Sequence, residues 1–228
     1  MAELFDSYDK TYAAVVQSSI DFSGLPHRFF MVAKAQILRD LLTTHLSRMR
    51  AVDALDIGCG VGTLHPLVRG MFRRLCGVDV SATSIAQARR KNLDVEYEVY
   101  NGAILPYSDA SFDLATAICV MHHVSAASWL SFLREVRRVV RPGGLVCVIE
   151  HNPFNPLTRL AVARCPFDND AVLLRASQAR QLLVGAGLHD IETRYFLLLP
   201  WCTAITQRVE YGLRRFPFGA QYATYGVA

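Results

Sequence analysis

A glycine-rich turn followed by an acidic residue is the part of this sequence that most directly suggests chemistry. The apolar run that ends at Ile57 leads into Gly58, Gly60 and Gly62, and Asp79 stands at the end of the next apolar run. Glycine lets the backbone approach a ligand where a Cβ atom would collide with it. A carboxylate about 20 residues further on, at the tip of the neighbouring strand, commonly binds both hydroxyls of a ribose. Together the two features predict a ligand that contains a nucleoside.

The spacing of the glycines separates two candidate nucleoside ligands. A dinucleotide fingerprint, G-x-G-x-x-G, would need a third glycine where the sequence has Thr63. Asp56 precedes the turn, and its charge would repel a pyrophosphate but suits a ligand that carries an ammonium and a sulfonium. These residues favour S-adenosylmethionine over NAD. The whole segment, L-D-I-G-C-G-V-G-T at residues 55–63, resembles the first motif of the class I S-adenosylmethionine-dependent methyltransferases.

That resemblance implies an α/β, Rossmann-like fold: a seven-stranded, mostly parallel sheet with helices on both faces. Alternating strand and helix patterns along the chain agree with it. The patterns predict strands at residues 54–57, 75–80, 95–100, 112–120, 145–150, 191–198 and 221–227. They predict helices at residues 29–49, 82–91, 128–140 and 177–184, and Arg-Pro-Gly-Gly at 141–144 is expected to end the third.

One domain is expected over residues 1–228. Within it, residues 1–50 would form an N-terminal helical flap and cap, and residues 51–150 the cofactor-binding core. Residues 151–228 would form the substrate-side half, with an irregular, proline-rich lid and the last strands. The specific motifs of the family cover only residues 55–150.

The family's motif positions assign further cofactor contacts. Asn101, where members more often carry Asp, would bind the adenine edge together with the backbone amide of Ala103. Val80 would cover the adenine face or simply pack in the core, and Cys119 would lie near the methionyl part of the cofactor. The resemblance thus implies a cofactor site made of Asp56, Gly58, Cys59, Gly60, Gly62, Asp79, Val80, Asn101, Gly102, Ala103 and Cys119, with Tyr12, Phe30 and Lys34 closing over it.

Histidines and a carboxylate follow the fourth and fifth predicted strands. His122 and His123 come after residues 112–120, and Glu150 and His151 end the next strand. Since the carboxyl ends of parallel strands meet at one edge of a sheet, all four would face the acceptor beside the cofactor. Histidine is suited to removing a proton near neutral pH, and a carboxylate can support it. The four residues are candidate catalytic groups; packing at a helix start is the alternative for the histidine pair.

The sequence predicts no metal site. His122, His123 and Asp113 show no recognised ligand spacing, and Asp168 with Asp170 is equally typical of a solvated turn. Methyl transfer from a sulfonium is a direct displacement, in which much of the acceleration comes from alignment of the reacting atoms. A base is therefore helpful without being obligatory.

The length of the chain favours a small-molecule acceptor, because no separate domain is left to recognise a protein or nucleic acid. The sequence around residues 150–170 resembles methyltransferases of glycan and natural-product pathways, which predicts O-methylation of a sugar or natural-product hydroxyl. Three alternatives remain open: C- or N-methylation of a lipid-like or aromatic metabolite, a non-catalytic S-adenosylmethionine-binding regulator or scaffold, and a nicotinamide oxidoreductase, which Asp56 and Thr63 disfavour.

Composition narrows the setting and the partners. The net charge of +4 comes from scattered basic residues, which argues against nucleic-acid binding. The six cysteines lack C-x-x-C spacing and are expected to be reduced, as in a cytoplasmic protein. The opening residues do not resemble a signal peptide, and the uncharged run at residues 195–207 is too short to span a bilayer. That run allows a transient membrane contact, and either a monomer or a homodimer is expected.

Overall fold

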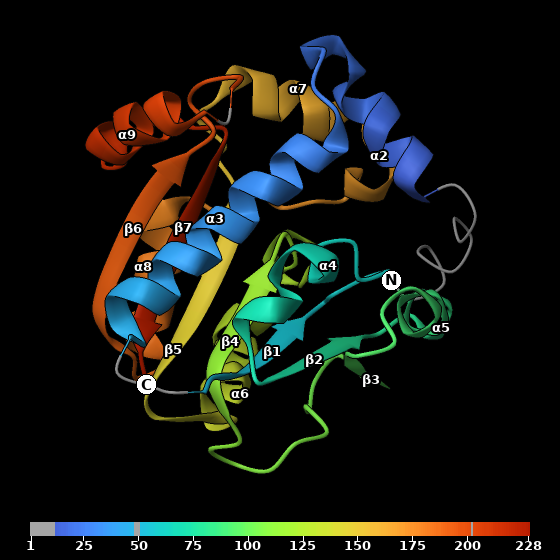
Figure 1. Ribbon diagram of the computed structural model, residues 1–228, viewed down its shortest axis with the longest axis vertical. Coiled ribbons are helices and arrows are strands. Elements are labelled where there is room, and N and C mark those ends of the chain that lie inside the picture. The colour runs from blue at the N-terminus through green and yellow to red at the C-terminus, as the bar shows by residue number, and fades with distance from the viewer. Residues whose placement is uncertain (1–11, 48–50, 202) are drawn as a thin grey trace.

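The computed structural model describes residues 12–47, 51–201 and 203–228, and a single twisted sheet forms its centre (Figure 1). The sheet has seven strands in the order β3-β2-β1-β4-β5-β7-β6. Neighbouring strands pair in parallel from β3 to β5, whereas β7 runs antiparallel to both β5 and β6. The strands are β1 (Asp53–Ile57), β2 (Arg74–Asp79), β3 (Glu96–Val99), β4 (Phe112–Ile118), β5 (Val140–His151), β6 (His189–Phe196) and β7 (Gln221–Val227). The predicted mostly parallel sheet is confirmed.

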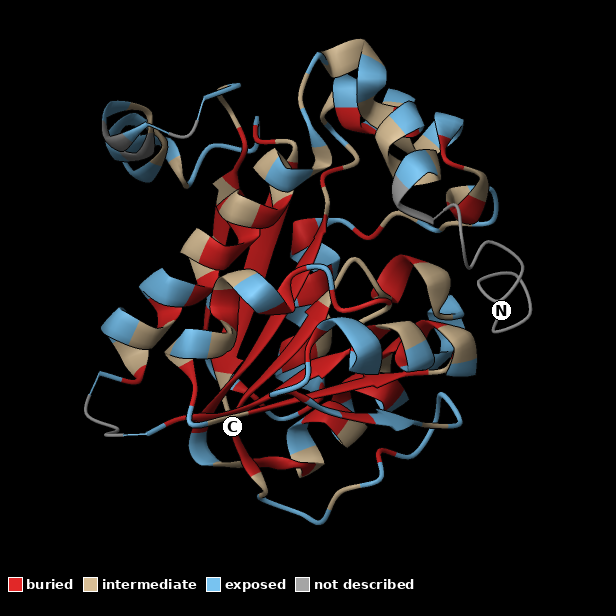
Figure 2. Cartoon of the chain, turned by 45° about the vertical axis from the view of Figure 1, so that its right-hand side comes forward, coloured by how far each residue is buried: buried red, intermediate tan, exposed pale blue. Residues whose placement is uncertain are grey.

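Helices cover both faces of the sheet, as predicted. One buried cluster packs under α6 and α8 and includes Leu133 and Leu183. A second packs under α3 and α5, on the other face, and includes Leu41 and Ile85. The central strands are buried almost throughout (Figure 2), whereas the edge strands β3 and β6 also carry exposed residues. The longer helices are α2 (Tyr12–Ile20), α3 (His27–His45), α5 (Ala82–Lys91), α6 (Trp129–Arg138), α7 (Pro156–Arg164), α8 (Ala176–Gly185) and α9 (Ala204–Leu213), and α4 (His65–Val68) is a single turn.

A layer of helices lies beyond the carboxyl ends of the parallel strands. Helix α7 follows β5 directly, and α2 packs against it, so the two meet at the top of the molecule (Figure 1). Helix α9 follows β6 and lies over the same end of the sheet (Figure 1). The sequence predicted an irregular lid after residue 151, but Asn155 caps α7 by accepting a hydrogen bond from the backbone N–H of Thr158 at 3.0 Å. Pro156 then occupies the first helical turn, where its missing N–H costs nothing.

The Arg-Pro-Gly-Gly segment at residues 141–144 was predicted to end a helix but belongs to β5. Helix α6 ends at Arg138, and β5 begins two residues later. The segment forms an irregularity in the pairing with β4, where Phe112 faces Val140 and Leu114 faces Leu145. The reason is that proline and glycine are compatible with a β-bulge as well as with a helix end.

Candidate active site

The turn between β1 and α4 contains glycines of two kinds. A Cβ atom at Gly58 would overlap the side chain of Val120, and one at Gly62 would lie 2.5 Å from Tyr97 Oη. Nothing lies within 4 Å of a Cβ built at Gly60. The sequence predicts that all three glycines allow close approach of a ligand, but only Gly60 faces open space. Gly58 and Gly62 are therefore required by internal packing, and Gly60 is the position where a ligand can approach the backbone.

Alanine substitutions at Gly60 and Gly62 should differ in their effects on stability and on cofactor binding. Gly62 and Gly60 both have left-handed φ angles, +69° and +53°. For Gly60→Ala we expect a loss of about 1–2 kcal/mol in the free energy of unfolding from backbone strain, together with weaker cofactor binding. For Gly62→Ala, overlap with Tyr97 and Asn92 adds to this strain, so we expect a loss of about 2–4 kcal/mol. Urea denaturation and titration with S-adenosylhomocysteine measure the two effects; equal stability losses in the two variants would contradict this account.

Asp79, at the end of β2, connects this turn to its own strand. Its carboxylate accepts hydrogen bonds from the backbone N–H groups of Gly60 at 2.8 Å and Ser81 at 2.9 Å. Burial raises the pKa of the carboxyl, and these two hydrogen bonds oppose that effect. Each carboxylate oxygen can accept more than one hydrogen bond. Asp79 can therefore receive the two hydroxyls of a ribose beside the open face of Gly60.

The segment after β3 forms a tight turn held by its own hydrogen bonds. Asn101 Oδ1 accepts hydrogen bonds from the backbone N–H groups of Ala103 and Ile104, both at 2.9 Å. Gly102 adopts a φ of +80°, and Val80 lies beside it with intermediate exposure. The amide of Ala103, predicted to bind adenine, thus donates within the loop. Recognition of a base by Ala103 would require this turn to open.

Cys119, directly after β4, lies under the N-terminal helices. Its backbone has a φ of +56°, and its Sγ is 3.4 Å from Lys34 Nζ of α3 and 3.6 Å from Gln221 Nε2. Burial would raise the pKa of the thiol, but the Lys34 ammonium and His151 outweigh it and lower the pKa to about 7. Lys34 therefore points toward the edge of the sheet where β4 ends, as predicted. Its buried ammonium lies beside Cys119.

The structure does not place the other two residues predicted to close over the cofactor, Phe30 and Tyr12, against a cofactor site. Phe30 packs against the core under α3 and forms an edge-to-face contact with Phe29 at 5.4 Å between ring centroids. Tyr12 begins α2, and its side chain lies outside the described part of the structure, as do residues 1–11 of the predicted flap.

His122 and Glu150 form a buried ion pair where β4 and β5 end. His122 Nδ1 lies 2.6 Å from Glu150 Oε2, and each side chain is 1% exposed. The other oxygen of Glu150 accepts the backbone N–H groups of Val120 at 3.0 Å and Met121 at 2.7 Å. Burial opposes charge on both partners, but their mutual attraction dominates, raising the pKa of His122 and lowering that of Glu150. Glu150 therefore fixes the position of the His122 ring and favours its charged form.

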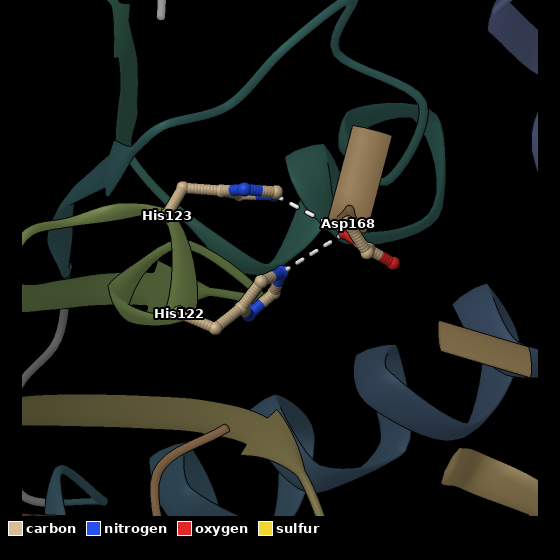
Figure 3. Close-up of side chains that lie close together, drawn as sticks. All are labelled: His122, His123 and Asp168. Carbon is tan, nitrogen blue, oxygen red and sulfur yellow. Dashed lines mark ion pairs between the residues drawn. The ribbon is translucent and has the colours of Figure 1, made fainter. Parts of the chain in front are cut away.

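Asp168 joins this cluster from a distant part of the sequence. It lies in the short 3-10 helix η5 (Pro166–Asp168), and its Oδ1 is 3.4 Å from His122 Nε2 and 3.5 Å from His123 Nε2. Both imidazole rings point toward it (Figure 3). Burial, followed by the charge of His122, lowers the pKa of His123 to about 4. Of the two equal possibilities for Asp168, the solvated turn does not apply, because its side chain is only 11% exposed.

The acidic residue that the sequence analysis considered beside the histidine pair lies elsewhere. Asp113 accepts the backbone N–H of Asp53 at 2.8 Å and pairs with Arg141. The remaining predicted catalytic residue, His151, ends β5 with its Nδ1 3.4 Å from Gln221 Nε2. Its ring centroid is 5.2 Å from that of His122. The four predicted catalytic residues are thus brought together.

Asp56 is engaged inside the domain, through a partner that the sequence analysis did not select. Its carboxylate accepts the hydroxyl of Thr116 at 2.7 Å and lies 3.1 Å from His65 Nε2. The other ring nitrogen of His65 contacts Tyr97 Oη. His65 is almost fully buried, and nothing in its sequence context distinguishes it from a surface histidine at a helix start. Thr116 and His65 therefore partly stabilise the charge of Asp56 next to the turn.

Comparison with known proteins identifies the fold and the family. A family model described as a methyltransferase domain matches residues 55–148. Residues 55–148 of this chain therefore form a class I S-adenosylmethionine-dependent methyltransferase domain. The methyl donor of this family is S-adenosylmethionine, the nucleoside that the glycine turn predicted. The match begins at β1 and ends within β5, so it includes Gly60, Asp79 and the histidine pair.

Known relatives of the methyltransferase domain are similar over part of their length. A probable S-adenosylmethionine-dependent methyltransferase of Mycobacterium tuberculosis is 33% identical over 146 residues, which cover 63% of this chain and 51% of the relative. A ubiquinone biosynthesis O-methyltransferase of a Methylobacterium is 33% identical over 130 residues, which cover 52% of this chain and 51% of that protein. The matched region thus spans about half of each relative.

A solved structure is similar over the whole chain. A methyltransferase of Thermotoga maritima, described as a possible histamine N-methyltransferase, superposes with a TM-score of 0.72 at 19% identity, over 100% of this chain and 99% of that one. At this identity the likeness concerns the fold alone. Among the described residues of the methyltransferase domain, no helix has the length and apolar character needed to cross a membrane.

Proposed function

We propose that the chain transfers the methyl group of S-adenosylmethionine to a hydroxyl oxygen of a small molecule of the sugar or natural-product class. One observation supports this most: the carboxylate of Asp79 beside the open face of Gly60 and the histidine–carboxylate cluster at the ends of β4 and β5 share one edge of the sheet. A cofactor held at the first would present its methyl group toward the second.

The residues around the cofactor fit its three parts. Asp79 would accept the ribose hydroxyls, and Gly60 would let the ligand lie against the backbone. Lys34, a buried ammonium beside Cys119, would pair with the methionyl carboxylate. When bound, the cofactor supplies an electrophilic methyl carbon: the acceptor oxygen bonds to that carbon as the carbon–sulfur bond breaks, leaving S-adenosylhomocysteine, and the hydroxyl proton is released.

The histidine cluster would receive the acceptor. His122 is enclosed, with both ring nitrogens facing carboxylates, so we assign it a positioning role together with Glu150. His123 and His151 are only partly buried: His123 would contact the acceptor, and His151 would receive its proton. The similarity to O-methyltransferases of ubiquinone biosynthesis supports an oxygen acceptor. A norajmaline N-methyltransferase of Rauvolfia serpentina, 34% identical over 106 residues, supports the alternative of nitrogen.

Isotope-labelled methyl transfer to a panel of phenols, glycosides and amines tests this proposal. We expect label in O-methyl products identified by mass spectrometry. Label confined to N- or C-methyl products would replace the hydroxyl acceptor with the alternative class. Tight binding of S-adenosylhomocysteine without transfer to any of these acceptors would favour a non-catalytic binding protein.

A further inference from the structure

We propose that His122, His123 and Asp168 bind a divalent transition-metal ion, for which Zn²⁺ is the reference. One ligand atom from each of the three residues lies within 4.8 Å of the other two, and the Nε2 atoms of both histidines face Asp168 Oδ1. They come from two segments that follow different strands, and the rings and the carboxylate converge on one point (Figure 3). Among the described residues, no other group of three or more histidine, cysteine or acidic side chains has such geometry.

The distances within the group suit a metal better than direct hydrogen bonds. The two nitrogen–oxygen distances are 3.4 Å and 3.5 Å. A good N–H···O hydrogen bond is shorter, at about 2.9–3.0 Å. Around a tetrahedral ion with bonds of about 2.0–2.1 Å, neighbouring ligand atoms stand about 3.3–3.4 Å apart. The two nitrogen–oxygen distances therefore match the spacing of neighbouring ligand atoms in a coordination shell.

The surroundings of His122 are those of a metal ligand. Metal-binding histidines usually donate their second ring N–H to a carboxylate or carbonyl, which fixes the tautomer. Glu150 fills this place at 2.6 Å from His122 Nδ1 and is itself held by two backbone N–H groups. With His122 Nδ1 donating to Glu150, its Nε2 faces Asp168. A metal ion would occupy the place of the proton shared there.

Charge and ligand type indicate which ion would bind. Glu150 and Asp168 bring two largely buried carboxylates to one pair of imidazoles, and a divalent cation would balance them. Two nitrogens and one oxygen suit Zn²⁺ and its transition-metal neighbours, whereas Mg²⁺ and Ca²⁺ prefer oxygen ligands. The group offers three ligands, so a four-coordinate ion would keep one position for water or a substrate.

The fourth position gives the site a use in the proposed reaction. This part of the inference rests on the proposed function, because it places the acceptor oxygen on the ion. His123 is 17% exposed and Asp168 is 11% exposed, so the site can be reached from outside. A metal ion lowers the pKa of a bound hydroxyl and orients its oxygen for attack on the methyl carbon. The hydroxyl proton would then pass to His151, the remaining histidine of the cluster.

Metal titration of the whole chain tests the inference without an activity assay. After dialysis against a chelator, we expect one Zn²⁺ ion to bind per chain in calorimetry, and Co²⁺ to give the visible absorption of a four-coordinate site. Asp168→Asn should weaken Zn²⁺ binding by at least about tenfold. The matched control is Asp170→Asn, an exposed acid two residues away, which should bind Zn²⁺ like the parent chain.

Folding and cofactor binding are measured on the same samples. Thermal melting checks that Asp168→Asn retains the fold, and His123→Ala provides a second ligand variant. We expect both to bind S-adenosylhomocysteine like the parent chain. Loss of saturable Zn²⁺ binding in the parent chain, or equal binding by Asp168→Asn and Asp170→Asn, would overturn the metal site. Failure of the parent chain to bind S-adenosylhomocysteine while Zn²⁺ binds normally would instead count against the proposed function.

Discussion

Replacing Glu150 by alanine should lower the free energy of unfolding by about 3–5 kcal/mol, the cost of leaving a buried charge without its partner. Glu150 is fully buried and accepts hydrogen bonds from the backbone N–H groups of Val120 and Met121 besides pairing with His122. Its removal leaves the Nδ1–H of His122 and two backbone N–H groups without an acceptor in a region that excludes water. The loss of three buried hydrogen bonds at once accounts for the size of this expected effect.

Urea denaturation followed by circular dichroism measures the effect, and Glu98→Ala provides the control. Glu98 is exposed on β3 and lies 3.6 Å from the Arg89 guanidinium. An exposed pair of this kind contributes about 0–1 kcal/mol. Similar losses for the two alanine variants would show that the Glu150–His122 pair does not support the fold. Glu150→Gln, which keeps the size of the side chain, should lose less than Glu150→Ala because its amide oxygen can still accept Val120 and Met121.

Replacing Asp79 by alanine should weaken binding of S-adenosylhomocysteine by about 1–3 kcal/mol, or about 5- to 150-fold. The carboxylate is expected to bind the ribose hydroxyls by charge-assisted hydrogen bonds, which are stronger than neutral ones. It also accepts the backbone N–H of Gly60, so its loss loosens the turn on which the cofactor would lie. Both effects act in the same direction on affinity.

Calorimetric titration of Asp79→Ala and of a control, Asp94→Ala, measures this effect. The Asp94 side chain is 68% exposed and lies 3.3 Å from the Arg69 guanidinium. The control should bind S-adenosylhomocysteine like the parent chain. Asp79→Asn should fall between the two, because its amide keeps one acceptor oxygen and loses the charge. Unchanged affinity in Asp79→Ala would remove the ribose assignment.

Much of the fold could be predicted because its signals are local. A buried strand, a turn with glycines and an acidic strand end occupy neighbouring positions in the sequence, and β1, β2 and the turn lie where they were expected. The convergence of His122, Glu150 and His151 followed from a general rule on the carboxyl ends of parallel strands. These predictions needed no knowledge of long-range contacts beyond the order of the strands.

Other features depend on contacts between distant residues. Asp168 lies 46 residues after His122 in the sequence, in a proline-containing turn whose local pattern is that of a surface loop. Only the folding of η5 against the end of β4 brings its carboxylate to the two imidazoles. The need for glycine at position 62 also depends on distant residues, because Tyr97 and Asn92 leave no room for a side chain there. Local patterns identify residue types suited to chemistry, while their partners are chosen by packing.

The most direct measurement is parallel calorimetric titration of the purified chain with S-adenosylmethionine, S-adenosylhomocysteine and NAD. The spacing of the glycines, the carboxylate of Asp79 and the match to the methyltransferase domain predict saturable binding of the first two at one site per chain, and no binding of NAD. Binding of NAD without S-adenosylmethionine or S-adenosylhomocysteine would contradict the account at its centre.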